Sequence, residues 1–160
     1  MFPLATVRIF DAYAGGEGVL GANLFGAVPV ARAGPNPRMN EAELQRYLSE
    51  TPWYPTALLP AAGIAWDGID DRRARATVED GSVSASAVFH FDGSDRIERV
   101  TSERYRQEDD DHAPWTGHFQ GYEERNGLVV PTEAEVEWNL PEGDRPYWRA
   151  TVERIEHRPA

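Results

Sequence analysis

Three glycines near the start of the chain, Gly16, Gly18 and Gly21, have the spacing of a dinucleotide-binding turn. Such a turn follows a strand and opens a helix, whose N-terminus holds the pyrophosphate. The segment 7–13, VRIFDAY, has the character of a strand, but the residues after Gly21 include two glycines and three prolines within ANLFGAVPVARAGPNP. This composition predicts a second strand over 18–31 instead of a helix. We therefore expect a glycine hairpin and no cofactor.

A histidine inside a predicted strand is the catalytic candidate. Alternation along 116–125 places His118 and Tyr122 on one face, with Gly117 and Gly121 beside them. Histidine acts as a general acid or base near neutral pH, and glycine in a strand admits a ligand close to the backbone or forms a bulge. His118, with Tyr122 as its companion, is thus the candidate base of a cofactor-independent cyclase, isomerase or hydrolase. A buried carboxylate is the alternative base.

Two groups of acidic residues are interpreted as solvated surface. Glu133, Glu135 and Glu137 alternate along one predicted strand, so all three face the polar side, where arginines of neighbouring strands can pair with them. The segment 107–114 is predicted to be an acidic loop. Its consecutive side chains 109–112, Asp-Asp-Asp-His, do not have the spacing with which ligands converge on one ion, so no metal site is predicted.

Aromatic side chains suggest a ligand cavity. The chain has five tryptophans, and a cavity lined by rings binds apolar molecules while the polar tips of Trp and Tyr orient them. An ordinary aromatic core is the alternative for each ring taken singly. Phe119, Tyr147 and Trp148 belong to the same aromatic set. The residues predicted to bind the ligand are Trp53, Tyr54, Leu58, Leu59, Trp66, Phe89, Phe91, Trp115 and Trp138.

One amphipathic helix is predicted to cover the sheet. Asn40 is a suitable N-cap, and Glu43 falls at the capping-box position. The apolar segment 53–60, WYPTALLP, predicts a short helical piece after it. The residues that recur at helical spacing and define the buried face are Leu44, Tyr47 and Leu48. The polar residues expected on the other faces are Glu41, Glu43, Gln45, Arg46 and Glu50.

The chain from Gly63 onward is predicted to be a run of strands, separated by turn dipeptides such as Asp80-Gly81 and Asn126-Gly127. Apolar and polar residues alternate within them, as in an antiparallel sheet with one covered face. The strands predicted here are 62–67, 72–79, 82–91, 95–106, 116–125, 129–139 and 146–157. The predicted fold is mainly β, in the α+β class: a curved antiparallel sheet or half-barrel of about nine strands, wrapped around one helix plus a short helical segment.

Composition narrows the possible partners. The chain has 160 residues and a net charge of −11, so we expect one domain over 1–160 that binds no nucleic acid. It has no cysteine and no lysine, which excludes disulfides, thiolate metal sites and Schiff-base chemistry. No apolar run has the length of a membrane span and no signal peptide is recognisable, so we expect a cytoplasmic protein without membrane insertion.

Several blocks in order resemble a bacterial domain family of unknown function that is widespread in high-GC genomes; among them are RYLSETPWYPTALLP, FHFDGSDRIERV, APWTGHFQGYEERNGLVVPTEAEVEW and LPEGDRPYWRATVERIE. The resemblance covers residues 7–157 and implies no activity or site residue. More distantly, the expected architecture resembles the bacterial lipoprotein carriers, which hold acyl chains between a curved sheet and a helical plug, and one cofactor-free pigment-biosynthesis enzyme. Members of the family have further strands before this start, so we expect a shortened chain with an open sheet edge that a homodimer would cover.

Three functions follow from these features. The first is the binding of a small apolar or acyl-type ligand between the curved sheet and its helical plug, which requires a pocket of roughly several hundred Å³ there. The second is the cofactor-independent enzyme that uses His118 or a buried carboxylate. The third is a homo-oligomeric interaction protein.

Overall fold

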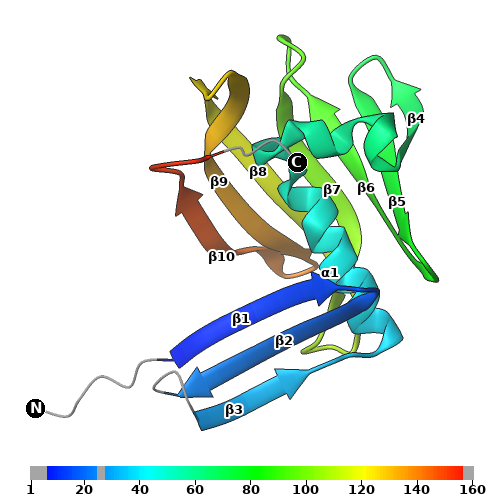
Figure 1. The fold of residues 1–160 in the computed structure, drawn as a ribbon, viewed down its shortest axis with the longest axis vertical. Helices are drawn as coiled ribbons and strands as arrows, with labels where there is room; N and C mark the ends of the chain where they lie inside the picture. Colours follow the sequence, from blue (N-terminus) through cyan, green and yellow to red (C-terminus); the bar gives the residue numbers. More distant parts are fainter. Residues whose placement is uncertain (1–6, 25–27, 157–160) are drawn as a thin grey trace, which may run out of the picture.

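The computed structural model describes residues 7–24 and 28–156, which form ten strands in two antiparallel sheets and one α-helix (Figure 1). The strands are β1 Val7–Ala14, β2 Glu17–Leu24, β3 Val28–Ala33, β4 Ile64–Asp70, β5 Arg73–Asp80, β6 Val83–Phe91, β7 Ile97–Arg106, β8 Asp111–Arg125, β9 Leu128–Leu140 and β10 Gly143–Thr151. Strands β1 to β3 form a small sheet, and β4 to β10 form a large one that does not close into a barrel. The predicted mainly β class is confirmed, with the strands divided between two sheets.

The glycine turn joins β1 to β2 as an antiparallel hairpin, with Gly15 and Gly16 at φ +60° and +80°. The hairpin prediction is therefore confirmed. A strand follows the glycines, so the turn offers no helix N-terminus to a nucleotide phosphate. The segment 18–31, predicted as one strand, is divided between β2 and β3, which pair with each other.

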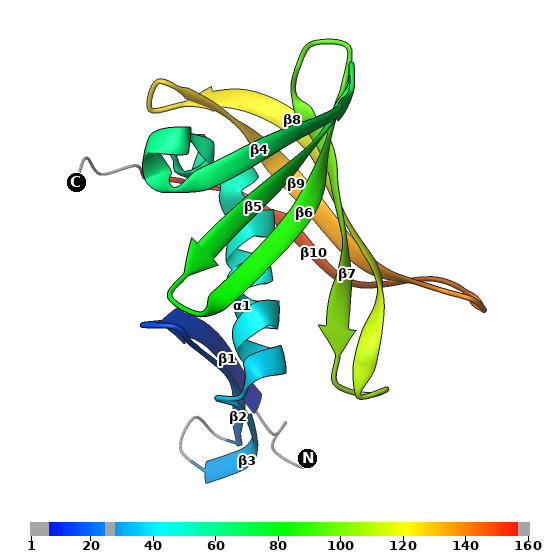
Figure 2. The ribbon, with the colours of Figure 1, turned by 90° about the vertical axis from the view of Figure 1, so that its right-hand side faces the viewer.

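In the large sheet each strand pairs antiparallel with its neighbour in sequence, in the order β10-β9-β8-β7-β6-β5-β4. The alternation along β6 is as predicted, because Ala85, Ala87 and Phe89 are buried, whereas Ser84 and Ser86 on the other face are not. Figure 2 shows the sheet curving around the helix. The core therefore lies between the concave face of the large sheet and the helix.

The helix α1, Pro37–Glu50, begins three residues before the predicted N-cap. Asn36 caps it, because its Oδ1 accepts the N–H of Met39 at 3.0 Å and Pro37 fits the first helical position. The predicted cap, Asn40, was therefore wrong. Asn40 lies inside the helix, and its Oδ1 accepts the backbone N–H of Gly18 at 2.9 Å, which ties the small sheet to α1.

More of the α1 surface is buried than its apolar pattern predicts. Leu44 and Leu48 pack into the core as expected, whereas Tyr47 is 38% exposed. Glu43 and Gln45, predicted on the polar faces, are 4% exposed. The reason is that the large sheet packs against α1 on one side while β1 and β2 of the small sheet contact it on another (Figure 1).

The predicted short helical segment 53–60 is present as single 3-10 turns between α1 and β4. These turns are η1 Thr51–Trp53, η2 Pro55–Leu58 and η3 Pro60–Ala62. Trp66 fastens them to the core, since its indole N–H donates to the Leu58 carbonyl at 2.9 Å and its ring meets Phe89 edge-on with centroids 5.2 Å apart.

The ladder between β6 and β7 is incomplete. The two strands pair only where 88–91 meets 97–101, and beyond this they diverge (Figure 2). Gln45 of α1 fills the gap between them. Its Nε2 donates to the Ser86 carbonyl of β6 at 3.0 Å and to the Glu103 carbonyl of β7 at 3.2 Å.

The acidic loop is shorter than the predicted 107–114. Only 107–110 forms the turn, because β8 begins at Asp111 and residues 111–114 pair with 103–106 of β7. Continuing the ladder satisfies backbone groups that a loop would leave to water.

Candidate ligand-binding cleft

A cleft of about 580 Å³ lies beside the helix on the concave side of the large sheet. It exists because α1 packs against β5, β6 and β7, which leaves the part formed by β8 to β10 without a helix over it. Strand β1 of the small sheet approaches this uncovered part from the other side (Figure 1). The cleft is therefore built by elements from both sheets, by α1 and by η1.

Aromatic side chains form the apolar wall of the cleft. Trp53 of η1 meets Phe119 of β8 edge-on at 5.6 Å between ring centroids, and it meets Trp148 of β10 at 6.2 Å. The indole N–H of Trp53 donates to the Pro131 carbonyl at 3.1 Å, which fixes the ring. Trp148 is 45% exposed, so part of this apolar wall faces solvent, where a ligand can cover it.

Trp115 of β8 joins the apolar wall to the polar end of the cleft. Its indole N–H donates to the Tyr147 hydroxyl at 2.9 Å. The guanidinium of Arg104 lies over the Trp115 ring, 5.4 Å from its centroid, in a cation–π contact. Arg104 also donates one hydrogen bond, of 3.3 Å, to the Ala42 carbonyl of α1.

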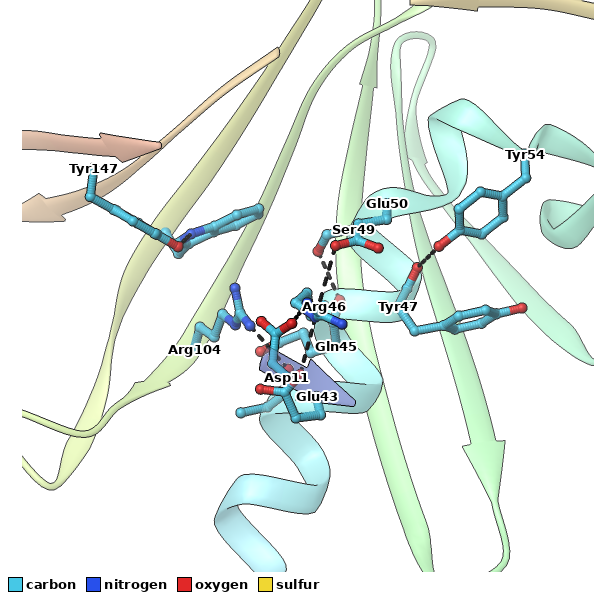
Figure 3. A network of polar contacts seen from close by, with 12 residues as sticks. Asp11, Glu43, Gln45, Arg46, Tyr47, Ser49, Glu50, Tyr54, Arg104 and Tyr147 are labelled. Carbon is cyan, nitrogen blue, oxygen red and sulfur yellow. Dashed lines mark hydrogen bonds and ion pairs between the residues drawn. The ribbon is translucent and has the colours of Figure 1, made fainter. Parts of the chain in front are cut away.

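The helix side of the cleft carries a cluster of charges around Arg46 (Figure 3). Its Nε lies 3.0 Å from Oε2 of Glu43 and 3.8 Å from Oε1 of Glu50, one turn away on either side. The same guanidinium pairs with Asp11 of β1. Three carboxylates from two elements thus surround one arginine.

Burial shifts the pKa values of the groups in this cluster and of the neighbouring Arg104. It raises the pKa of Glu43, and the charges of Arg46 and Arg104 oppose it only in part. It also raises the pKa of Glu50. Burial would lower the pKa of Arg46, but the surrounding carboxylates outweigh it and raise that pKa. Arg104 has weaker compensation, so burial lowers its pKa.

Two of the predicted ligand-binding residues, Trp53 and Trp115, lie in the wall of this cleft. Phe89 is fully buried, and three others pack around the same core. These three are Leu58, Trp66 and Phe91. Of these, Trp66 and Leu58 join the sheet to the segment that follows α1.

The remaining three predicted ligand-binding residues lie outside the wall. Tyr54 donates its hydroxyl to the Tyr47 carbonyl at 3.1 Å, and Leu59 is 54% exposed. Trp138 stacks on Tyr147 with centroids 6.0 Å apart, so it supports a residue that does line the cleft.

The predicted catalytic residues are not brought together. His118 contacts Oε1 of Glu137 at 3.0 Å on the convex face, whereas Tyr122 packs against the core and donates its hydroxyl to the Ile97 carbonyl at 2.6 Å. Burial raises the pKa of that hydroxyl. Gly121, at φ +65°, lies between them and interrupts the alternation of β8 that the prediction assumed. Neither side chain lines the cleft.

Sequence reasoning missed the polar end of the cleft. Arg46 and Glu50 were assigned to solvated faces of the helix, and Asp11 and Arg104 were not considered. No local pattern identifies the group, because its residues come from three elements, β1, α1 and β7, which meet only where the small sheet approaches the large one. Tyr147 and Trp148 belonged to the aromatic set, but no sequence feature separated them from the other rings.

The acidic groups of the sheet lie where the alternation predicts. Glu135 pairs with Arg149, and Glu133 accepts a hydrogen bond of 2.6 Å from Gln120. In the acidic turn, Asp109 pairs with Arg106. Across residues 7–24 and 28–156, no three His, Cys, Asp or Glu side chains gather as metal ligands.

The fold and the cleft define a mainly β protein with one helix held between two antiparallel sheets. The chain belongs to a family of unknown function, DUF6920, whose model matches residues 1–157. No curated protein and no solved structure matches it. In the described part of the chain, no helix combines the length and apolar character that a membrane crossing needs.

Proposed function

We propose that this protein binds a small ligand with an apolar body in the cleft between α1 and strands β8 to β10. The observation that carries the proposal is the cleft itself. Its volume of about 580 Å³ falls within the range of roughly 300–1,000 Å³ that small-molecule sites occupy. An aromatic wall beside a few polar groups is the usual lining of such sites.

Binding is favoured over catalysis by the surroundings of the titratable groups. The carboxylate of Asp11 is paired with Arg46, Glu50 lies beside the same guanidinium at 3.8 Å, and His118 lies on the other face of the large sheet. A general base needs a free oxygen or nitrogen within reach of the substrate. The predicted homodimer through an open sheet edge and the cytoplasmic location stay predictions.

Filling the cleft tests the proposal. Val136 of β9 lines the cleft, whereas Val129, on the same strand, is 51% exposed outside it. The wild-type protein should bind the neutral apolar dye N-phenylnaphthylamine in a saturable way, seen as enhanced dye fluorescence. Val136→Trp places an indole where the dye would lie, so the dye affinity should fall about tenfold or more, equivalent to ~1.4 kcal/mol.

The matched control is Val129→Trp, which adds the same side chain to the same strand and should keep the wild-type affinity. Circular dichroism and the Tm of each variant establish that the fold is intact. Wild-type protein that does not enhance the dye saturably would refute the proposal, and so would Val136→Trp that binds the dye as tightly as Val129→Trp.

A further inference from the structure

We infer that the ligand carries a carboxylate, which Arg104 and Tyr147 bind at the polar end of the cleft. The inference rests on the proposed function and names the chemical class of the ligand, a monocarboxylate with an apolar chain or ring. It follows from the unequal pairing of the two arginines that line the cleft.

Arg104 is the arginine without a counter-ion. Arg46 has three carboxylates around it, whereas no carboxylate of the described residues lies within 4.0 Å of the Arg104 guanidinium. Arg104 has five N–H donors and makes one hydrogen bond, to the Ala42 carbonyl. A partly buried guanidinium that lacks a carboxylate is costly, and an anionic ligand would remove that cost.

Tyr147 supplies a second donor at the same place. Its hydroxyl oxygen accepts the Trp115 N–H at 2.9 Å, which leaves the hydroxyl proton to be donated. Arg104 lies over the same Trp115 ring, and the charge of its guanidinium acts on the Tyr147 hydroxyl. Figure 3 shows Arg104 and Tyr147 on the same side of the charge cluster. Trp115 therefore contacts both donor groups, Arg104 through its ring and the Tyr147 hydroxyl through its indole N–H.

The acidic residues of the cleft leave N–H donors of Arg104 unoccupied. Asp11 and Glu50 lie against Arg46, and together with Glu43 they outnumber its single positive charge. Asp11 and Glu43 also raise the pKa of Arg104, but neither is within 4.0 Å of its guanidinium, so Arg104 keeps N–H donors for a ligand. A planar carboxylate suits it best, because two parallel N–H···O bonds match the fork of the guanidinium. The rings of Trp53, Phe119 and Trp148 lie next to this end and would cover an apolar body.

Three amphiphiles with the same alkyl chain and different headgroups test whether the cleft prefers a negatively charged ligand. Dodecanoate, dodecanol and dodecylamine are compared by their displacement of N-phenylnaphthylamine from the wild-type protein. Dodecanoate should bind about tenfold more tightly than dodecanol, because a hydrogen bond to a charged group is worth that much or more. Dodecylamine should bind no more tightly than dodecanol.

Two arginines of β7 provide the variant and its matched control. Arg104 lies over Trp115, and Arg106 lies over Trp138 with its Cζ 5.9 Å from the ring centroid, but Arg106 pairs with Asp109 outside the cleft. Arg104→Gln should reduce the dodecanoate advantage from about tenfold to about twofold or less. Arg106→Gln should leave the advantage at the wild-type value. Tyr147→Phe should lower it several-fold and serves as the test if Arg104→Gln does not fold.

The outcomes separate the two proposals. If the dye binds and the three amphiphiles displace it equally, or dodecylamine displaces it best, the carboxylate inference is overturned while the proposed function stands. The same holds if Arg104→Gln and Tyr147→Phe both keep the full dodecanoate advantage. If the dye does not bind at all, the proposed function fails and the inference fails with it.

Discussion

Glu43 is the residue at which the charge cluster meets the core. Its side chain is buried between α1 and the small sheet, and Oε2 faces Nε of Arg46 at 3.0 Å. Burial raises its pKa, Asp11 and Glu50 add to the rise, and Arg46 and Arg104 oppose it. The folded protein therefore binds a proton at Glu43 more tightly than the unfolded chain does.

This predicts a contribution to stability that falls as the pH rises. The pKa of Glu43 in the folded protein lies above its ordinary value of 4.5. At pH values between these two pKa values, the folded protein binds more protons than the unfolded chain, so the free energy of unfolding decreases as the pH rises through this range. Glu43→Gln cannot ionise. Its unfolding free energy, measured in urea from pH 4 to 7, should therefore improve relative to wild type as the pH rises.

The control for this prediction is Glu41→Gln on the same helix, where the side chain is 43% exposed. Its difference from wild type should vary less with pH than that of Glu43→Gln. A Glu43→Gln difference that is constant over this range, or that shrinks with rising pH, would show that the sign is wrong.

At the scale of elements, α1 supplies hydrogen bonds to the large sheet where the ladder between β6 and β7 ends. Gln45 supplies two N–H donors to carbonyls of β6 and β7, at the point where the two strands diverge. Gln45 is 4% exposed, so water has little access to take over its hydrogen bonds to the two carbonyls. A polar residue on the inward side of a helix is explained here by the break in the sheet it covers.

We expect Gln45→Leu to destabilise the fold by about 2 kcal/mol, because two carbonyls lose a donor while the volume is nearly kept. Hydrogen exchange should also accelerate around the divergent halves of β6 and β7. Ser49→Ala is the control, because its hydroxyl donates only to the Gln45 carbonyl within the same helix; it should cost about 1 kcal/mol or less. Equal losses for the two variants would mean that the bridge contributes nothing of its own.

At the scale of the molecule, two sheets pack against one helix. The small sheet can do so only because the backbone of β2 comes very close to α1 at Gly18. A Cβ added at Gly18 would lie 2.6 Å from the Met39 carbonyl oxygen and 2.9 Å from Cβ of Glu43. Only glycine therefore lets β2 lie against α1. Strand β1 contributes Asp11 to the lining of the cleft. The contact of β2 with α1 and the pairing of Asp11 with Arg46 hold β1 in place.

Gly18→Ala should lower the free energy of unfolding by about 2 kcal/mol, since the added methyl group meets backbone that must move. It should also weaken dye binding, because β1 moves with β2. Gly68→Ala, on the edge strand β4 where nothing lies within 4 Å of the new Cβ, should change stability by less than about 0.5 kcal/mol and leave binding alone. Urea unfolding and the dye titration measure both effects, and a harmless Gly18→Ala would contradict the packing described.

Local patterns in the sequence predicted the parts of the structure that depend on neighbours along the chain. The glycine hairpin follows from the φ angles that Gly15 and Gly16 reach, and the buried face of β6 follows from strict alternation. The mainly β class with one helix follows from the same periodicity and from the turn dipeptides. Each of these is decided by the backbone geometry of a few consecutive residues.

The tertiary structure decided what lies between elements. Asn40 has the sequence context of a cap, but its side chain accepts a hydrogen bond from the small sheet. Glu43 and Gln45 have the sequence context of surface residues, but they are buried. Arg104 is a candidate ligand-binding residue only because it lies over Trp115, which is hydrogen-bonded to Tyr147. The division of the strands into two sheets, with α1 between them, brings these residues together. Contacts of this kind join residues far apart in the chain, so the periodicity within any one segment carries no record of them.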